Sequence, residues 1–439
     1  MKILNLLILA LVIFIWLASF LGFSWLETFI FGATLILLVQ GGFASLGMLY
    51  SFLKPENLQR VLPPRVVFGK GWHKYSLIVP ARNEEKVIAD TILAMSKINY
   101  PKDLYEVLIV VRDNDPQTKE TALKAIEKTN ADNIKLVTID GFPVNKAYSL
   151  NMGLHYSQAD VVAVFDAEDQ PHPDILNSVD EVFSKKKVDI VQAGVQLVNV
   201  GSKWFSVFNC LEYYFWFKSI LPFFSRLGAS PLGGNTVFLK KYVLEKLGGW
   251  DEECLTEDAD IGVRAAEADF KTEMIYVEDM ATLEESPSDE QSFIRQRSRW
   301  DEGYLQVLLK GNWLNLPTLK QQFLSFYILI QPLIHYFAFS AMAILPLASL
   351  FLKARLWLAV FSWLPFYFLM LQFGLYFLGL WDLKKNYNLA FSILIFPFLF
   401  LTFIPYQFLL AVSFIRALGR LILGKTNWEK TPHFNIHRV

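Results

Sequence analysis

Cysteine and charge are both scarce in this sequence. The 439 residues include only two cysteines, Cys210 and Cys254, which excludes a disulfide framework and a cysteine-based structural zinc site. Charged residues make up 19% of the chain, below the roughly 25% of soluble domains, and hydrophobic residues make up 53%. The net charge of −1 excludes a general nucleic-acid binder held by phosphate attraction. We therefore expect part of the chain to lie in a membrane.

Two long stretches near the N-terminus contain no charged residue. They run from Ile3 to Phe23 and from Ile30 to Tyr50, and each approaches the roughly 20 apolar residues that a bilayer-spanning helix needs. A cleaved signal peptide has a shorter apolar core, and a second span does not follow it so closely. The sequence therefore predicts two N-terminal transmembrane helices that form an uncleaved anchor.

The C-terminal third contains three further stretches without charge: Phe323 to Leu352, Leu356 to Trp381 and Asn386 to Ile415. Basic residues tend to stay on the cytoplasmic side of a membrane, which places Lys384, Lys385 and the basic tail in the cytoplasm. If the central segment is also cytoplasmic, an even number of crossings must follow it. We therefore divide the last stretch near Ile404–Pro405 into two short spans, which gives four C-terminal crossings.

The charge distribution supports this division into parts. Only ten of the 41 basic and three of the 42 acidic residues fall outside residues 51–322, so the central segment is acidic and its flanks are basic. An acidic domain needs metal ions or local cations to hold an anionic substrate. The predicted parts are an N-terminal membrane anchor (1–50), a cytoplasmic domain (51–322), C-terminal transmembrane helices (323–424) and a cytoplasmic tail (425–439).

The central segment alternates short apolar runs with helical patterns. The runs predict buried strands at Tyr75–Pro80, Glu106–Val111, Ile134–Ile139, Asp160–Phe165 and Val188–Ala193. The helical patterns between them cover Glu84–Ile98, Pro116–Lys128, Lys146–Tyr156 and Pro173–Lys186. Such alternation predicts right-handed crossovers and an α/β domain with a mostly parallel, Rossmann-like sheet. Ligands of such sheets bind beyond the carboxyl ends of the strands.

Polar residues follow the first, second and fourth predicted strands. The turn Asp166-Ala167-Glu168-Asp169 places three carboxylates within four residues, and a divalent cation would neutralise their mutual repulsion. The alternative is a solvated acidic turn that caps the following helix. Because the sequence contains no Walker loop and no glycine-rich dinucleotide fingerprint, a metal and Lys146 would have to hold any phosphates.

Two later motifs each permit two interpretations. Thr256-Glu257-Asp258 opens a helical stretch, so its carboxylates either do chemistry or favour the helix N-terminus. The run Gln296-Arg297-Ser298-Arg299-Trp300 belongs either to a catalytic element or to an amphipathic helix whose arginines face lipid phosphates. We expect interfacial helices near residues 204–224, which are rich in aromatic side chains, and near residues 290–322.

Taken in order, these motifs resemble the membrane-integrated family 2 glycosyltransferases, which include cellulose, chitin and hyaluronan synthases. The resemblance rests on Val79-Pro80-Ala81-Arg82-Asn83-Glu84-Glu85, Asn145 to Asn151, Asp166 to Asp169, Thr256 to Asp258 and Gln296 to Trp300. It covers roughly residues 70–310 and implies a GT-A-type fold. The Gln-x-x-Arg-Trp element is similar to the polymer-making branch, although some membrane lipid glucosyltransferases share it.

The resemblance implies a role for each matching residue. Asp258 matches the general base, and Trp300 and Glu257 lie at the acceptor site. Asp166 and Glu168 match the pair that holds Mg²⁺ or Mn²⁺. The residues implied to bind the nucleotide sugar are Ala81, Asn83, Glu84, Asp113, Lys146, Asp166, Gln296 and Arg299.

For two segments the resemblance does not settle the role of the residues. After the second strand the chain reads Arg112-Asp113-Asn114-Asp115 where relatives have another acidic turn, so Asp113 is the first candidate to contact the nucleoside and Asp115 the second. The tail Asn427 to His433 resembles C-terminal segments of some relatives. It either folds back over the site or lies on the membrane surface.

The resemblance further implies an inverting enzyme in the cell membrane, with several spans and a cytoplasmic catalytic domain. Its partners would be a UDP- or GDP-sugar donor, a glycan or lipid-linked acceptor and the bilayer, with no nucleic acid. The first hypothesis is extension of a polysaccharide with passage of the product through the spans. The second is transfer of one sugar to a lipid. A third, from another class, is a membrane scaffold or transporter without catalysis.

Overall fold

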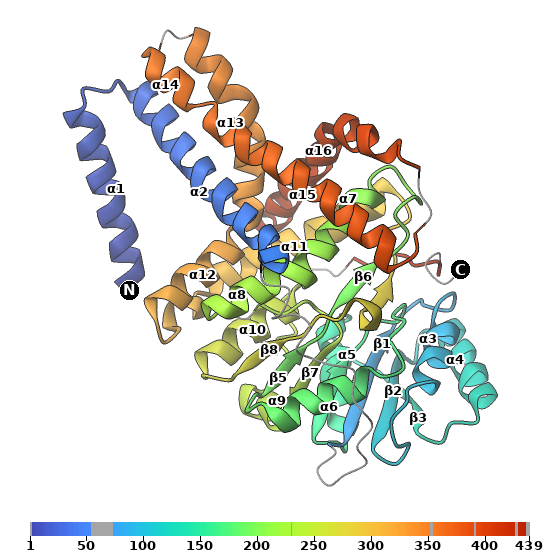
Figure 1. Cartoon of the computed structure of the whole chain (residues 1–439). Helices are drawn as coiled ribbons and strands as arrows, with labels where there is room; N and C mark the ends of the chain where they lie inside the picture. The colour runs from blue at the N-terminus through green and yellow to red at the C-terminus, as the bar shows by residue number, and fades with distance from the viewer. Residues whose placement is uncertain are drawn as a thin grey trace.

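The computed structural model describes residues 2–53, 73–229, 231–351, 354–389, 392–425 and 429–435. It has two parts: an α/β part around one large sheet, and long helices that rise from one side of it (Figure 1). The N-terminus lies at the end of the first long helix that is closer to the α/β part, and the C-terminal tail lies beside the α/β part.

Seven strands form the large sheet of the described residues, in the order β3-β2-β1-β4-β7-β5-β8. Their bounds are β1 Tyr75–Ala81, β2 Tyr105–Arg112, β3 Ile134–Ile139, β4 Val161–Val164, β5 Ile190–Gln192, β7 Val237–Lys240 and β8 Thr272–Met274. A small parallel pair, β6 (Val195–Leu197) and β9 (Thr282–Glu284), lies apart from it. The strand predictions for β1 to β5 are confirmed to within two residues at each end, and the mostly parallel sheet is confirmed.

Strand β7 corrects one detail of the predicted topology. It pairs antiparallel with both β4 and β5, so these two strands are not neighbours. The apolar run at 237–240 is only four residues long, and nothing in its sequence shows that it inserts between two strands. The pairing is decided by long-range contacts, which local sequence patterns do not record.

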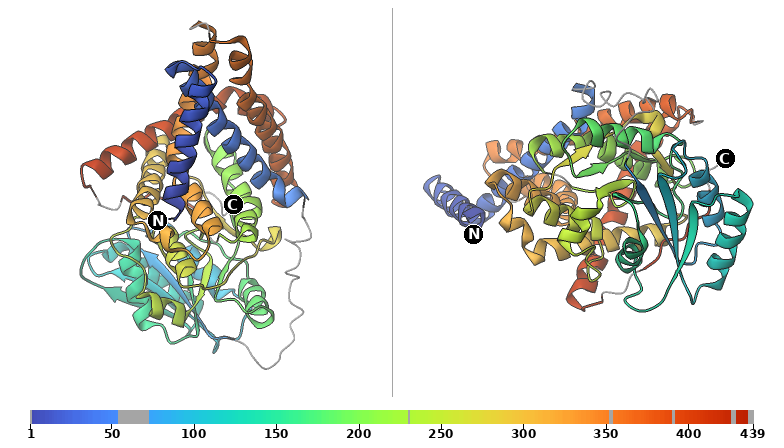
Figure 2. Two further views of the ribbon diagram at one scale, coloured as in Figure 1. Left: turned by 90° about the vertical axis from the view of Figure 1, so that its left-hand side faces the viewer. Right: turned by 90° about the horizontal axis from the view of Figure 1, so that it is seen from below.

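Helices cover both faces of the sheet (Figure 2, right). The alternation of side chains along each strand explains this: Leu77 and Val79 pack with one set of helices, and Ile78 packs with the other. The first face carries α3 (Ile88–Ser96), α4 (Pro116–Thr129) and α6 (Ile175–Lys185). The second face carries α5 (Lys146–Tyr156), α9 (Lys241–Leu247) and α10 (Glu257–Glu267).

Several helices join the α/β part to the long helices. They are α7 (Ser206–Phe215), the π-helical turn η2 (Trp216–Ile220), α8 (Leu221–Leu227), α11 (Glu290–Lys310) and α12 (Leu319–Leu329). Short 3₁₀ turns lie at Glu278–Met280 and Asn312–Asn315. Lys218 in the π-helical turn bonds to both Glu278 and Asp382, so partly buried ion pairs hold the two parts of the chain together.

The long helices are α1 (Lys2–Phe20), α2 (Trp25–Leu53), α13 (Gln331–Phe351), the short α14 (Leu356–Phe361), α15 (Leu364–Asn386) and α16 (Ile395–Ile422). Among the described residues, four helices are long and apolar enough to cross a membrane, namely α2, α13, α14 with α15, and α16. The apolar stretch of α1, Ile8–Phe20, is shorter.

The predicted break near Ile404–Pro405 is wrong. Helix α16 runs without interruption through Pro405. Proline removes one backbone hydrogen bond, and neighbouring packing can preserve the helix around it. Here Phe403 contacts Phe208 and Phe373, and Tyr406 stacks on Phe208 at 4.6 Å between ring centroids.

Candidate active site

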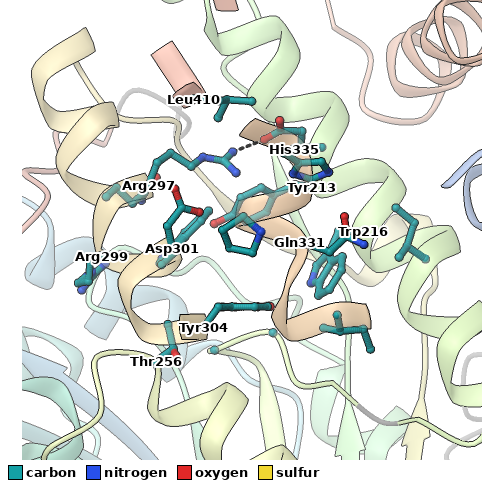
Figure 3. A pocket seen from close by; sticks show the side chains of 18 of the residues that line it. Tyr213, Trp216, Thr256, Arg297, Arg299, Asp301, Tyr304, Gln331, His335 and Leu410 are labelled. Atoms are coloured by element: carbon teal, nitrogen blue, oxygen red, sulfur yellow. Dashed lines mark hydrogen bonds and ion pairs between the residues drawn. The ribbon is translucent and has the colours of Figure 1, made fainter. Parts of the chain in front are cut away.

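A cavity of about 740 Å³ begins at the carboxyl ends of β1 and β4 and continues between α11, α7 and the long helices. Figure 3 shows its middle part, where Asp301 and Tyr304 of α11 face Gln331 and His335 of α13 across the open space. The edge of the sheet on which the sequence predicted the site therefore opens into the helical part of the molecule.

Most residues predicted for the site line this one cavity: Ala81, Glu84, Lys146, Asp166, Glu168, Glu257, Asp258, Gln296, Arg299 and Trp300. They come from five separate stretches of the sequence. Three of these follow β1, β3 and β4, which end at one edge of the sheet, and α10 and α11 bring the other two to the same cavity. Asn83 and Asp113 do not belong to the lining.

Lys146, at the first turn of α5, is the central cation of the site. Its Nζ lies 2.5 Å from Asp166 Oδ1 and 3.7 Å from Glu257 Oε1, and it donates a hydrogen bond of 3.1 Å to the carbonyl of Gly234. Burial disfavours the charged form, but the two carboxylates outweigh it and raise the pKa of Lys146 above its ordinary value. The amine therefore remains an ammonium ion, suited to a phosphate.

Asp258 and Glu257 occupy the first turn of α10 at the floor of the cavity. Burial raises the pKa of Asp258 above 3.8, although Lys146 and Arg299 oppose this rise. Burial likewise raises the pKa of Glu257, to about 7. The side chain of Thr256 makes no capping hydrogen bond, so this helix start is not stabilised in the usual way. Carboxylates with raised pKa values in a cavity are suited to accept a proton.

Gly303 on α11 allows this helix to pack directly against the turn before Asp258. A Cβ atom at this position would overlap the side chain of Thr256, which is almost fully buried. The distance between the arginines of α11 and the carboxylates of α10 therefore depends on the absence of a side chain at Gly303.

We expect Gly303→Ala to lower turnover about a hundredfold, because displacing reacting groups by about 1 Å has effects of this size. The overall fold should persist, since the change adds one methyl group. Steady-state kinetics and circular dichroism of the purified variant would measure both. Gly419→Ala on α16 is the matched control, because outside its own helix no described residue lies within 4 Å of its added Cβ. An equal loss in both variants would contradict the role of this contact.

Helix α11 carries the Gln-x-x-Arg-Trp run, and its polar face turns inward. Arg297 bonds to Glu212 and, at 2.6 Å, to Asn209 on α7, and its guanidinium stacks 4.7 Å from the ring centroid of Trp300. A helix lying on lipid headgroups would direct this arginine outward. The arrangement instead fixes Trp300 at the wall of the cavity that Asp258 also lines.

The acidic turn after β2 lies outside the cavity. The Asp113 side chain is 62% exposed and pairs with Lys119 at 3.0 Å. Asp115 is buried, accepts hydrogen bonds from the backbone N–H groups of Asn83 (2.5 Å) and Thr118 (3.3 Å), and so caps α4. The structure therefore does not bring Asp113 to the other predicted residues, because an N-cap position directs Asp115 inward and leaves Asp113 on the surface.

Asp169 has a structural role in the acidic turn after β4. It is fully buried, and its carboxylate accepts hydrogen bonds from the backbone N–H of Asp166 (2.8 Å) and from Asn235 (3.0 and 3.1 Å). These contacts hold the turn that presents Asp166 and Glu168. The acidic cluster is thus not a solvated turn, since Glu168 is also buried.

The C-terminal tail folds back over the site. Lys430 Nζ lies 3.1 Å from Glu84 Oε2, and His433 Nε2 lies 3.2 Å from Glu168 Oε1. Glu429 anchors the tail, because it pairs with Arg416 at 2.6 Å and Arg420 at 3.0 Å on α16. Asn427 and Trp428 of the predicted tail motif lie outside the described residues.

Glu84, Glu168 and His433 form a cluster whose ligand atoms all lie within 4.8 Å of one another. Nδ1 of His433 is buried without a hydrogen-bond partner among the described residues. Burial and the charge of Glu168 raise the pKa of Glu84. Burial alone would raise the pKa of Glu168, but His433 lowers it below 4.5. Two carboxylates and an imidazole at this spacing form a donor set that fits a divalent cation.

Several residues of the cavity were not singled out from the sequence. Asp301, directly after the Gln-x-x-Arg-Trp run, lines the cavity, and burial raises its pKa to about 7. Asn235 reaches the site from a segment with no recognised pattern. His433 belongs to the tail that resembles segments of relatives, but the sequence assigned it no role as a ligand. The resemblance of the tail and the position of Asp301 next to Trp300 are the two signals in the sequence for these residues.

Comparison with known proteins agrees with the geometry. A family model described as "Glycosyltransferase like family 2" matches residues 73–303, more than half of the chain. "Probable glycosyltransferase YdaM" from Bacillus subtilis (strain 168) is 24% identical over 420 residues, covering 91% of this chain and 94% of that protein. "Beta-monoglucosyldiacylglycerol synthase" from Trichormus variabilis is 29% identical over 289 residues, 65% of this chain and 58% of that protein, somewhat over half its length.

Among solved structures, the mannosyltransferase PcManGT from Pyrobaculum calidifontis, in complex with GDP-Man and Mn²⁺, matches with a TM-score of 0.51 and 19% sequence identity. The match covers 91% of this chain and 99% of that one. At this level of identity the similarity establishes the fold, a GT-A-like α/β arrangement.

Proposed function

Because this chain belongs to glycosyltransferase-like family 2, we propose that it transfers a sugar from a UDP- or GDP-sugar to an acceptor hydroxyl at the cytoplasmic face of a cell membrane. One observation carries the proposal: Asp166, Asp258 and Trp300 line a single cavity, which also enters the helical part. Donor, base and acceptor surface would lie in separate places if these motifs were only structural.

The donor lies at the ends of β1 and β4 in this proposal. Ala81 and Glu84 border the nucleoside, and Lys146, Gln296 and Arg299 face the diphosphate. Asn83 contributes its backbone carbonyl, which accepts a hydrogen bond from Lys430 and so supports the tail. The contact of Asp113 with the nucleoside remains a proposal that rests on the resemblance alone, because the Asp113 side chain is exposed outside the cavity.

Glu168, Glu84 and His433 would hold the divalent cation, Mg²⁺ or Mn²⁺, with Asp166 beside them. Mn²⁺ is the ion bound in PcManGT. When bound, the cation stabilises the negative charge that develops on the leaving diphosphate. Asp166 Oδ1 is engaged by Lys146, so we assign Asp166 to positioning this lysine as well as to the cation.

The reaction then follows from the positions of the side chains. The carboxylate of Asp258 accepts the proton of the acceptor hydroxyl while the oxygen attacks the anomeric carbon. The bond to the nucleoside diphosphate breaks, and its electrons remain on the departing phosphate beside Lys146 and Arg299. Trp300 supports the acceptor, Glu257 lies next to the base, and the tail at Lys430 covers the donor. One displacement inverts the anomeric centre.

The arrangement of the helices supports a cytoplasmic catalytic domain and a chain with several spans. The tail contacts the α/β part directly, so an even number of crossings must separate them. Helices α13 and α15 provide two. The N-terminal end of α16 packs near the end of α15, where Phe396 contacts Phe377 and Tyr387 bonds to Tyr276 of the α/β part. At the other end of α16, Arg420 binds Glu302 of α11. We therefore place α16 along the membrane surface, and residues 51–322 with the tail in the cytoplasm.

Two acceptor classes remain as proposals. A growing polysaccharide, passed through the spans, is the first hypothesis from the sequence, and the Gln-x-x-Arg-Trp element supports it. Transfer of one sugar to a lipid is the second, and the apolar walls of the inner cavity support it. The size of the product separates them, because a polymer gives a ladder and a glycolipid gives one addition.

The proposal is tested with purified full-length protein and a panel of UDP- and GDP-sugars in Mg²⁺ or Mn²⁺. We expect nucleotide release and a glycosylated product, identified by mass. No turnover with any donor, in native lipid extracts included, would contradict the proposal and favour a non-catalytic membrane scaffold.

We expect His433→Ala to weaken Mn²⁺ binding about tenfold, because it removes one of three donor side chains. Binding is measured on the full-length protein by electron paramagnetic resonance of free Mn²⁺. His155→Ala on the exposed face of α5 is the matched control and should bind as the wild type does. Unchanged binding in His433→Ala would place the cation away from the tail.

A further inference from the structure

The cavity changes character along its length. At the level of α10 and α11 it is lined by ionisable side chains, among them Asp258 and Asp301. Further into the helical part, beyond the hydrogen-bonded pair Gln40–Gln331 (3.0 Å) and His335, the walls become apolar. The inner lining includes Leu37, Phe339, Met342, Phe368, Leu369 and Phe403.

The inner end of the cavity is closed. On α2 and α13 the lining extends no further than Leu37 and Met342, and described residues beyond them contribute none. A packed apolar cluster lies beyond this point, in which Ile30, Leu345 and Leu358 are almost fully buried. A polymer could not leave along this route without separating these three helices.

The depth of the apolar part matches one leaflet of a bilayer. Gln331 and Met342 are 11 residues apart on α13, which corresponds to about 16 Å at the rise of an α-helix. Half of the hydrocarbon core of a bilayer is about 15 Å. Helix α16 contributes Phe403, Ile404 and Phe414 to the lining of this cavity.

The acceptor side of the ionisable end disfavours an anionic head group. Lys146 and Arg299 are assigned to the donor diphosphate, and Arg297 is already paired with Glu212. The carboxylates of Glu257, Asp258 and Asp301 remain to face the acceptor, and they would repel a second phosphate placed there. It would also need no general base, since it is already ionised, whereas an alcohol does.

We infer that the acceptor is an uncharged lipid alcohol, whose hydroxyl lies at Asp258 and Trp300 and whose chains lie between α2, α13, α15 and α16. The inference rests on the proposed function and names the acceptor class of the same site. The closed inner end, the apolar walls and the acidic outer end all favour this class over a translocated glycan or a lipid phosphate.

The test uses the full-length protein in nanodiscs with Mn²⁺ and the active sugar nucleotide. Diacylglycerol, a polyprenyl phosphate and a water-soluble oligosaccharide are offered as separate acceptors. We expect labelled sugar to enter the organic phase only with diacylglycerol, as a single addition by mass. A soluble ladder, or transfer to the polyprenyl phosphate instead, would overturn the inference while leaving the proposed function intact. No nucleotide release in any arm would overturn both.

Narrowing the inner cavity should act on the acceptor alone. We expect Met342→Trp and Leu369→Trp, on opposite walls, to raise the KM for diacylglycerol about tenfold, because each overpacks the space for the chains. The KM for the sugar nucleotide should stay unchanged, which also shows that the variants fold. Leu347→Trp and Leu371→Trp lie on the same helices but face outward, and serve as controls. If the KM for diacylglycerol were the same in the two inner variants as in the two control variants, the inference would be overturned.

Discussion

Replacing Asp258 by asparagine is expected to lower kcat about a thousandfold, because the loss of a general base typically costs 10²- to 10⁴-fold. Asparagine keeps the size of the side chain and can still pack against the backbone of Gly234, which lies close to the Asp258 carboxylate. The affinity for the sugar nucleotide should therefore remain. Single-turnover kinetics, together with donor binding by calorimetry, would separate the two effects.

The pH dependence of kcat/KM provides a second readout of the same residue. The base must be ionised, and burial raises the pKa of Asp258 above 3.8, so activity should fall on the acidic side at a pH above that expected for an exposed aspartate. Asp258→Asn should lose this acidic limb. Asp269→Asn, at an exposed position paired with Lys271, is the control and should retain the wild-type profile. If Asp258→Asn kept turnover near the wild-type value, Asp258 would not be the base.

Replacing Glu168 by glutamine is expected to lower turnover at least a hundredfold and to weaken Mn²⁺ binding. Glu168 belongs to the cluster with Glu84 and His433, and its Oε1 lies 3.2 Å from His433 Nε2. An amide binds a hard cation less strongly than a carboxylate does, and a catalytic metal contributes several kcal/mol to the stabilisation of the leaving group. Titration of the metal-free enzyme with Mn²⁺ would measure activity and binding together.

The metal prediction has its own control. Glu127→Gln, at an exposed position on α4, should leave both metal binding and turnover unchanged. Treatment of the wild type with a chelator should abolish activity, and added Mn²⁺ or Mg²⁺ should restore it. Full activity of Glu168→Gln in chelator would show that the three side chains serve only to dock the tail.

The helical part of the molecule shows which features charge and hydropathy are sufficient to predict and which they are not. The stretches without charge coincide with the long apolar helices α2, α13, α15 and α16, because a long apolar helix is a property of consecutive residues. The path of α16 after Pro405 is not such a property. It depends on contacts with Phe208 on α7 and Ser298 on α11, both of them distant in sequence.

The sequence by itself determined the parts of this protein that are encoded locally. Strand β1, helix α5 and the polar residues at the ends of β1 and β4 follow from short apolar runs and capping patterns. For this reason the placement of Lys146, Asp166 and Glu168 at one edge was predictable.

Only the tertiary structure decided the rest. The insertion of β7, the outward direction of Asp113, the approach of His433 to Glu168 and the closed apolar end of the cavity all depend on pairs of residues far apart in the chain. Short-range periodicity records which face of an element is apolar. It does not record which distant segment covers that face, because the free energy of such contacts depends on the whole packed arrangement.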